Sequence, residues 1–145
     1  MSDLARFHEA QATAFPLALI ELTAGRKTSH WMWFIFPQLR DLGRSATAQH
    51  FGIEGITEAR AYLDDPILHQ RLEAAADALL LHVGERPETI IGTVDALKLR
   101  SSATLFALAG EGSDTGAKMQ AILDAFYRGE PCPLTLRLLE KAGDA

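Results

Sequence analysis

The sequence predicts an all-α fold class, a single compact helical bundle of about seven to nine helices. Apolar residues recur at three- and four-residue spacing in most segments, and no segment alternates strictly as a half-buried strand does. Proline and glycine mark the ends of these segments. The chain has 145 residues, of which 48% are hydrophobic, so one domain with a substantial core is expected over residues 1–145.

Two helices are predicted before the first glycine of the chain. A helix over residues 4–14 should end before Pro16, because the residue that precedes a proline disfavours the α conformation. Pro16 itself suits the first turn of a second helix, over residues 17–24. Helical spacing places Leu17 and Ile20 on the buried face of this second helix.

Residues 29–38, Ser-His-Trp-Met-Trp-Phe-Ile-Phe-Pro-Gln, hold both tryptophans of the chain. Aromatic side chains have the largest apolar area to bury, so we expect this stretch at the hub of the core and as one wall of a pocket. Periodicity does not distinguish a helix from a strand in so short a run. Its helical surroundings favour a short helix that ends at Pro37.

Capping residues predict the next three helices. Ser45 caps residues 46–51, and Asp65 lies between a helix over residues 57–63 and a longer one over residues 66–83. The longer helix has the clearest apolar stripe in the chain. The stripe consists of Leu68, Leu72, Ala75, Ala76, Leu79 and Val83.

Four more helices follow in the second half of the chain, each with an apolar face. The longest carries Ser101 on that face where a leucine would be expected, so its hydroxyl needs a partner or lines a cavity. The four span residues 87–91, 95–109, 117–127 and 134–141, and the face of the longest consists of Leu97, Ser101, Leu105 and Leu108.

The charge and hydropathy of the chain argue against two classes of partner. The formal net charge is −5, which argues against nucleic acid because such binding needs a basic surface. The longest uncharged apolar run, residues 31–37, is far too short to span a membrane. The chain starts without the basic and apolar regions of a signal peptide, so a cytoplasmic localisation is expected.

The residues that commonly bind metals or cofactors are too few or too scattered. Cys132 is the single cysteine, so it has no partner for an internal disulfide and no companion for a multi-cysteine metal site. The five histidines are far apart in the sequence. No phosphate loop, nucleophile elbow or zinc-binding helix is present. The sequence therefore predicts no metal and no cofactor, and it does not decide whether the protein is an enzyme.

His30, Trp31 and Trp33 are the sharpest candidate binding residues. On one interpretation they stack on, and hydrogen-bond to, a planar ligand such as a nucleobase or a nicotinamide ring. On the other, the rings are ordinary core aromatics and the backbone satisfies His30.

Basic residues are the second candidate feature. Lys98 and Arg100 lie beside Ser101, and Arg44 and Ser45 follow the aromatic stretch. If these side chains converge in space, they suit a phosphate-bearing small molecule in an otherwise acidic protein. The alternative is solvated charges beside a serine that packs between helices. Arg26, Lys27 and Arg40 are the further basic residues that would join such a pocket.

The first helix holds the third candidate feature. His8 and Gln11 border its apolar face, which is typical of a pocket rim or of a surface edge. Glu9 is the nearest carboxylate, and it could act as a general base only if the fold turned it inward.

Six stretches carry a family resemblance: Phe7-His8-Glu-Ala-Gln11, Gly25-Arg-Lys, residues 29–38, Leu42-Gly-Arg-Ser45, Ala61-Tyr-Leu-Asp-Asp-Pro66 and Leu97-Lys-Leu-Arg-Ser-Ser102. They resemble an uncharacterised bacterial family called domain of unknown function eighteen-ten, whose members are often mislabelled calpastatin. The resemblance covers nearly the whole chain and implies a small all-helical domain with no established activity. The calpastatin label has no weight here, because a calpain inhibitor is disordered whereas this chain is rich in core residues.

The chain also has a looser likeness to helical proteins that process ADP-ribose-related compounds and are related to a riboflavin-pathway N-glycosidase. This likeness is limited to the order of the helices and to short sequence matches. Ile91-Gly92 stands where that group has Trp-Gly, which is a departure. The likeness implies hydrolysis of an N-glycosidic bond; the alternative is a non-enzymatic helical protein-interaction module. For the hydrolase, the expected roles are phosphate binding by Arg44, Lys98 and Arg100, base stacking by Trp31 and Trp33, and charge stabilisation by Glu9 or Asp95.

Overall fold

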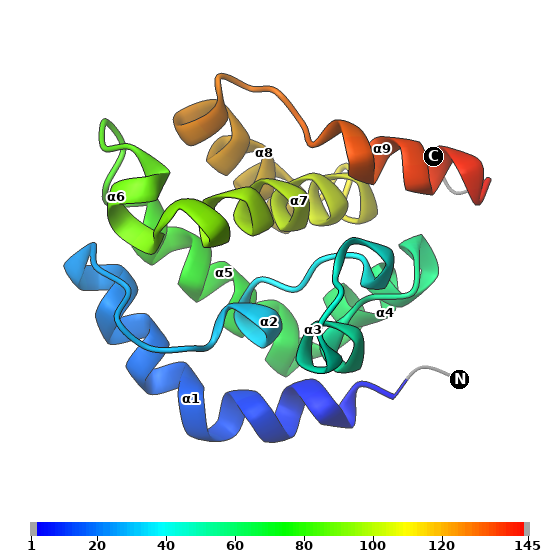
Figure 1. Cartoon of the computed structure of the whole chain (residues 1–145), viewed down its shortest axis with the longest axis horizontal. Coiled ribbons are helices and arrows are strands. Elements are labelled where there is room, and N and C mark those ends of the chain that lie inside the picture. Colours follow the sequence, from blue (N-terminus) through cyan, green and yellow to red (C-terminus); the bar gives the residue numbers. More distant parts are fainter. Residues whose placement is uncertain (1–2, 144–145) are drawn as a thin grey trace.

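The computed structural model describes residues 3–143, and in that range it contains nine α-helices, one 3-10 helix and no strand (Figure 1). The predicted all-α fold class is therefore confirmed. The elements are α1 (Ala5–Ala24), α2 (Met32–Ile35), η1 (Arg40–Leu42), α3 (Ala46–Phe51), α4 (Ile56–Asp64), α5 (Pro66–Leu80), α6 (Pro87–Ile91), α7 (Thr93–Ala109), α8 (Asp114–Tyr127) and α9 (Pro133–Lys141).

Helix α5 is the centre of the bundle, because it packs against α1 and against α8. Helix α7 packs against α8, α4, α6 and α9. In Figure 1, α1 runs along one edge of the molecule, and α7 and α9 lie toward the opposite edge. The aromatic stretch with α2 crosses the front between α1 and α7. Across residues 3–143, the helices lack the length and apolar character needed to cross a membrane.

Helix α1 corrects the prediction of two helices, since it continues through Pro16. A proline inside a helix costs about 3 kcal/mol because it removes one backbone hydrogen bond and bends the helix. The bend is visible near the middle of α1 in Figure 1. Phe7, Gln11, Ala18 and Leu22 are all buried and keep three- and four-residue spacing on both sides of the proline. Packing of this continuous stripe offsets the cost of the proline.

Four residues predicted in the core are exposed instead. In α1, the buried face of the first half of the helix continues past Pro16, so Leu17 and Ile20 lie on the opposite, exposed face. Helix α5 ends at Leu80, so Val83 lies beyond it and outside the core. In α7, residues 101–106 are all buried because several helices surround this segment, and Leu97 at the less covered end is 68% exposed.

Other predicted features of the helices are confirmed. The Ser45 side chain accepts a hydrogen bond from the Ala48 N–H at the start of α3. The Asp65 carboxylate caps α5 by accepting hydrogen bonds from two backbone N–H groups. Helix α2 ends at Ile35, just before Pro37, so the aromatic stretch contains a short helix, as predicted.

The aromatic stretch lies in the core, as predicted. Trp31 is 1% exposed, and the rings of Phe7, Tyr62 and Phe106 are also fully buried in the core. Tyr62 packs edge-on against Phe7 at a centroid distance of 5.2 Å, and its hydroxyl accepts a hydrogen bond from Gln11 Nε2 at 2.9 Å. Burial raises the pKa of the Tyr62 phenol, so this group stays neutral.

Candidate ligand site

The loop after α1 is held by one buried carboxylate, Glu21. Its oxygens accept five hydrogen bonds: from the backbone and hydroxyl of Thr28 at 2.8 and 3.0 Å, from those of Ser29 at 3.0 and 2.6 Å, and from Trp31 Nε1 at 3.0 Å. Burial raises the pKa of Glu21, but these hydrogen bonds outweigh it and hold the pKa at about 2. Glu21 is therefore a carboxylate at neutral pH, and it fixes the segment that carries Lys27.

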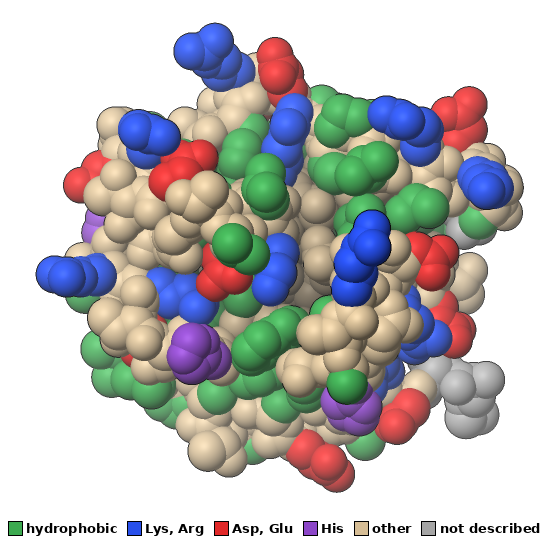
Figure 2. Space-filling model, viewed as in Figure 1, with side chains coloured by type: hydrophobic (Ala, Val, Ile, Leu, Met, Phe, Trp, Pro, Cys, Tyr) green, Lys and Arg blue, Asp and Glu red, His purple; other side chains and the backbone are tan. Residues whose placement is uncertain are grey.

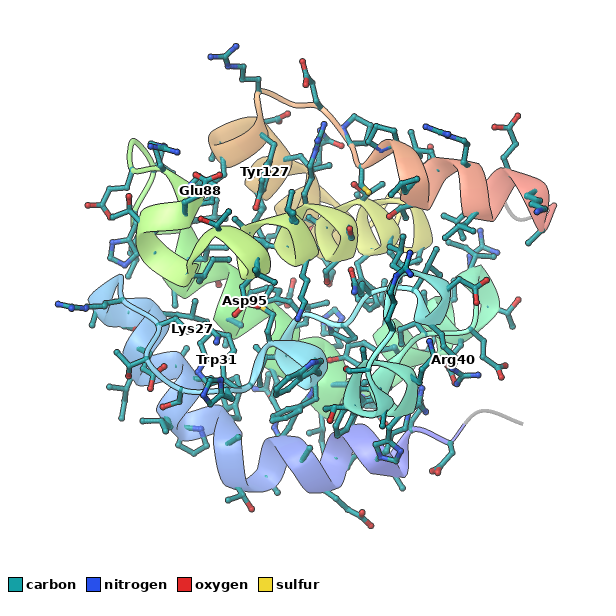
Figure 3. The ribbon with its side chains drawn as sticks, in the orientation of Figure 1. Lys27, Trp31, Arg40, Glu88, Asp95 and Tyr127 are labelled. Atoms are coloured by element: carbon teal, nitrogen blue, oxygen red, sulfur yellow. The ribbon has the colours of Figure 1, made fainter. Side chains whose placement is uncertain are left out.

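Lys27 and Lys98 meet at the carboxylate of Asp95. Lys27 Nζ lies 2.8 Å from Asp95 Oδ2 and 5.0 Å from the centroid of the Trp31 ring. Lys98 Nζ lies 3.7 Å from Asp95 Oδ1 and 5.5 Å from the centroid of the Trp33 ring. Figure 3 shows Lys27, Trp31 and Asp95 close together between the loop and the first turn of α7. We call these five residues the lysine–tryptophan cluster.

Beside this cluster lies a narrow, mostly apolar cavity of about 10 Å³, which we call the aromatic hollow. A ligand larger than one water would therefore lie across its mouth, over Trp33, unless Lys98 moved. Figure 2 shows basic side chains around a hollowed region on this face. The lining residues are Met32, Trp33, Phe36, Gln38, Ala48, Phe51, Gly52 and Lys98.

The fold brings together five of the residues singled out in the sequence: Lys27, Trp31, Trp33, Asp95 and Lys98. Trp31 is a core residue whose ring Lys27 covers, whereas Trp33 is half-buried and lines the aromatic hollow. The cluster therefore joins two cations, two indole rings and one carboxylate, and its Trp33 and Lys98 line the aromatic hollow. Cations over indole rings are attracted by the negative ring face, which holds both ammonium groups in place.

The candidates on α1 lie elsewhere. His8 Nε2 is 2.6 Å from Asp65 Oδ2, at the start of α5. Gln11 is 1% exposed, and its amide nitrogen donates to Tyr62 and to the Phe34 carbonyl, so it belongs to the core rather than to a pocket rim. Glu9 is exposed and does not line the aromatic hollow, so the inward turn that a general base requires does not occur.

Several basic and polar candidates also remain outside the cluster. His30 and Arg44 are exposed. Arg100 Nε donates to the Glu130 carbonyl at 3.0 Å. Ser101 has the partners that its position required, because its hydroxyl lies 3.2 Å from the Leu97 carbonyl and 3.4 Å from Cys132 Sγ. The basic residues therefore converge only in part, with Lys27 and Lys98 as the two that meet.

Sequence reasoning missed Glu21 and most of the hollow. One feature of the sequence could have indicated that Glu21 is buried. It directly precedes the apolar Leu22, and the hydrogen-bond donors Thr28 and Ser29 follow within a few residues. A carboxylate on a buried helix face needs such donors nearby. Phe51 and Gly52 come from a segment with no local mark of a binding site, so only the tertiary contact with α2 places them in the hollow.

The sequence model of the family described as "Protein of unknown function (DUF1810)" matches residues 1–139. Among solved structures, the crystal structure of the conserved hypothetical protein Rv1873 from Mycobacterium tuberculosis is similar. It has 43% sequence identity and a TM-score of 0.90, with 95% of this chain and 96% of that chain covered. No curated protein matches the chain.

Proposed function

Since the chain belongs to the family described as "Protein of unknown function (DUF1810)", we propose a function from its own residues. The protein binds a nucleotide-like, phosphate-bearing small molecule at the lysine–tryptophan cluster. Its reaction is hydrolysis of the N-glycosidic bond of an ADP-ribose-related compound, in the bacterial cytoplasm. The lone cysteine, which has no disulfide partner in the chain, agrees with a reducing compartment.

The observation that carries this proposal is the position of Lys98. Its ammonium group stands over the Trp33 ring at the mouth of the aromatic hollow, with a side-chain exposure of 26%. A phosphate can reach a partly exposed ammonium, and when it draws Lys98 off the Trp33 ring, a flat base can stack on the indole face that this uncovers. Gln38, also in the lining, supplies amide donors and an acceptor for the edge of a base.

Asp95 supplies the chemical group of the proposed reaction. When the bond between the sugar and the base breaks, positive charge develops on the sugar, and a nearby carboxylate stabilises it. Lys27 holds one oxygen of Asp95 at 2.8 Å, whereas Lys98 lies 3.7 Å from the other. A phosphate that draws Lys98 toward itself would free this second oxygen to face the sugar. The base leaves with the electron pair of the broken C–N bond, water adds its oxygen to the sugar carbon, and the proton that the water loses goes to the released base or to solvent.

A thermal-shift screen tests the binding. Purified protein is heated with NAD, ADP-ribose, AMP or inorganic phosphate, and a ligand at a hundred times its dissociation constant should stabilise it by about 2.7 kcal/mol. Lys98→Ala should weaken binding roughly tenfold to a hundredfold, since a hydrogen bond to a charged group contributes about 1.5–3 kcal/mol. The matched control is Lys118→Ala, because Lys118 is similarly exposed but pairs with Asp77 and Glu73 on α5.

Turnover separates the enzyme from a binding protein. Asp95→Asn should abolish release of the base from the ligand found in the screen while the thermal shift persists, because the amide removes the negative charge but keeps the shape. If no compound in the panel shifted the melting temperature, or if Lys98→Ala and Lys118→Ala weakened ligand binding equally, the proposal would have no basis. Binding without turnover in the unmodified protein would reduce it to a small-molecule binding protein.

A second candidate, a helical protein-interaction module, is favoured by one observation. Val94 and Leu97 are 66% and 68% exposed on the outer side of α7, next to the cluster, and exposed apolar neighbours are typical of contact surfaces. For such a module, Leu97→Asp abolishes binding to a protein partner and leaves small-molecule binding unchanged. Affinity measurements on the two kinds of ligand therefore distinguish the candidates.

A further inference from the structure

A second cavity, of about 300 Å³, lies between the end of α4, the start of α5 and the connection from α7 to α8. None of the residues of the lysine–tryptophan cluster lines it, so it is separate from the site of the proposed function. Pockets that bind small molecules in proteins have volumes of about 300–1,000 Å³. The cavity is therefore large enough for a compact ligand, and the side chains around it indicate which kind.

One wall of the cavity is formed by His69 and Thr115, and its polar groups already have partners. Thr115 is fully buried, and its hydroxyl lies 3.1 Å from His69 Nδ1 and 3.2 Å from Glu73 Oε2. The other ring nitrogen of His69, Nε2, lies 3.2 Å from Glu73 Oε1. Because both nitrogens of His69 have partners, this wall keeps its geometry and leaves the recognition of a charged ligand to other residues.

Three charged side chains of the lining remain without such partners: Arg60, Asp64 and Glu111. All three are exposed, and none of the ion pairs formed within residues 3–143 involves them. Arg60 and Asp64 are four residues apart on α4, so they lie on the same face of that helix. Glu111 comes from the connection between α7 and α8. The cavity therefore offers a ligand one guanidinium and two carboxylates.

We propose that this cavity binds a free basic α-amino acid, the class of lysine, ornithine and arginine. Arg60 binds the α-carboxylate, since a guanidinium matches a carboxylate with two hydrogen bonds. Asp64, one turn away on the same helix, binds the neighbouring α-ammonium group, and Glu111 binds the cation at the end of the ligand side chain. The methylene groups between these charges pack on Leu63 and Ala109, the apolar part of the lining.

The balance of charge favours this class over other small molecules. A basic amino acid has one anionic and two cationic groups, which is the reverse of the one cation and two anions of the cavity. A neutral amino acid would leave one carboxylate of the cavity without a partner, and an acidic one would add a repelling charge. A phosphate group would meet two carboxylates, so this cavity does not suit the nucleotide-like ligand of the proposed function.

The experiment titrates the full chain with L-lysine, L-ornithine and L-arginine by isothermal calorimetry at physiological ionic strength, where unspecific attraction between charges is screened. L-lysine should bind more tightly than L-norleucine, cadaverine and Nα-acetyl-L-lysine, each of which lacks one of its three charged groups. Arg60→Gln and Glu111→Gln should each weaken the binding of L-lysine roughly tenfold or more, because each removes a hydrogen bond between charged groups.

The matched controls are Arg137→Gln and Glu85→Gln, which make the same changes of charge at exposed residues outside the cavity. Both should bind L-lysine as the unmodified protein does. If none of the three basic amino acids bound, or if L-norleucine, cadaverine or Nα-acetyl-L-lysine bound as tightly as L-lysine, the proposal would be overturned. Equal losses of affinity in the control and the cavity variants would also overturn it. Melting temperatures establish that each variant is folded before it is titrated.

Discussion

Replacing Glu21 with glutamine is expected to lower the free energy of unfolding by about 3 kcal/mol at neutral pH. The carboxylate accepts five hydrogen bonds, three of them from the hydroxyl and backbone groups of Ser29 and from Trp31. A glutamine keeps the size but points an NH2 group at donors, so buried N–H and O–H groups lose their acceptor. For a domain of this length, such a loss lowers the melting temperature by roughly 10 °C.

The pH dependence of this effect has a definite sign. The pKa of Glu21 is about 2 in the folded protein, against 4.5 for an unperturbed carboxyl group. Its contribution to stability is therefore fully present above pH 4.5 and is lost as the pH falls toward about 2. Urea unfolding of the wild type and Glu21→Gln at neutral and at acidic pH should give curves that converge on acidification, because a protonated Glu21 resembles glutamine.

The matched control is Glu9→Gln, which changes an exposed carboxylate on the same helix. Its effect should stay within about 0.5 kcal/mol. If the two glutamine variants were equally stable, or if the gap between wild type and Glu21→Gln widened in acid, Glu21 would not be the anchor of the loop. The site depends on this anchor, since the same loop carries Lys27 to Asp95.

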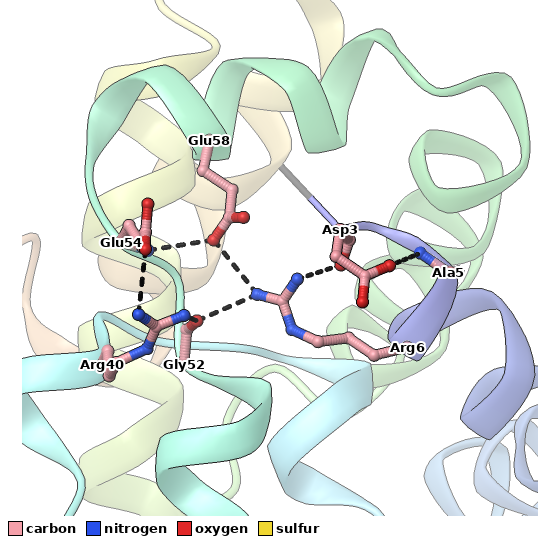
Figure 4. Close-up of polar contacts among 7 residues, drawn as sticks. All are labelled: Asp3, Ala5, Arg6, Arg40, Gly52, Glu54 and Glu58. Atoms are coloured by element: carbon pink, nitrogen blue, oxygen red, sulfur yellow. Dashed lines mark hydrogen bonds and ion pairs between the residues drawn. The ribbon is translucent and has the colours of Figure 1, made fainter. Parts of the chain in front are cut away.

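Replacing Arg6 with alanine should lower the free energy of unfolding by about 3–5 kcal/mol, because it leaves a buried carboxylate without its cation. Arg6 Nη2 lies 3.1 Å from Glu58 Oε1 and 3.0 Å from the Gly52 carbonyl, and the two side chains are only 7% and 5% exposed. Figure 4 shows how Arg6, in the first turn of α1, donates to the carbonyl of Asp3 just before the helix and also reaches Gly52 and Glu58.

A double-mutant cycle isolates this ion pair. The Arg6→Ala/Glu58→Ala protein should be less destabilised than the sum of its single variants, because the double change leaves no uncompensated charge. Arg40→Ala is the comparison: Arg40 pairs with Glu54, whose side chain is 67% exposed, so the loss should be no more than about 1 kcal/mol. Additive single effects in the cycle, measured by urea unfolding, would contradict the pairing of Arg6 with Glu58.

Much of the fold could be predicted from local sequence. The stripe of α5 from Leu68 to Leu79 is buried as its spacing predicts, and Ser45 and Asp65 cap the helices that follow them. These features depend on residues within one or two turns of each other, so propensity and pattern are sufficient to place them. The aromatic stretch likewise had to lie in the core, because no other segment has as much apolar ring area to bury.

The tertiary structure decided which face of each helix is covered and which distant side chains meet. Pro16 is a helix break by local rules, but burial of the stripe on both sides of it keeps α1 whole. Leu97 follows the apolar spacing of α7, yet it is exposed. Lys98 pairs with Asp95 three residues before it on α7, but Lys27 lies far away in the sequence, and only the packing of the loop against the first turn of α7 brings it to the same carboxylate. Local sequence therefore determined the helices and their caps, whereas the candidate site depended on long-range packing that no local pattern encodes.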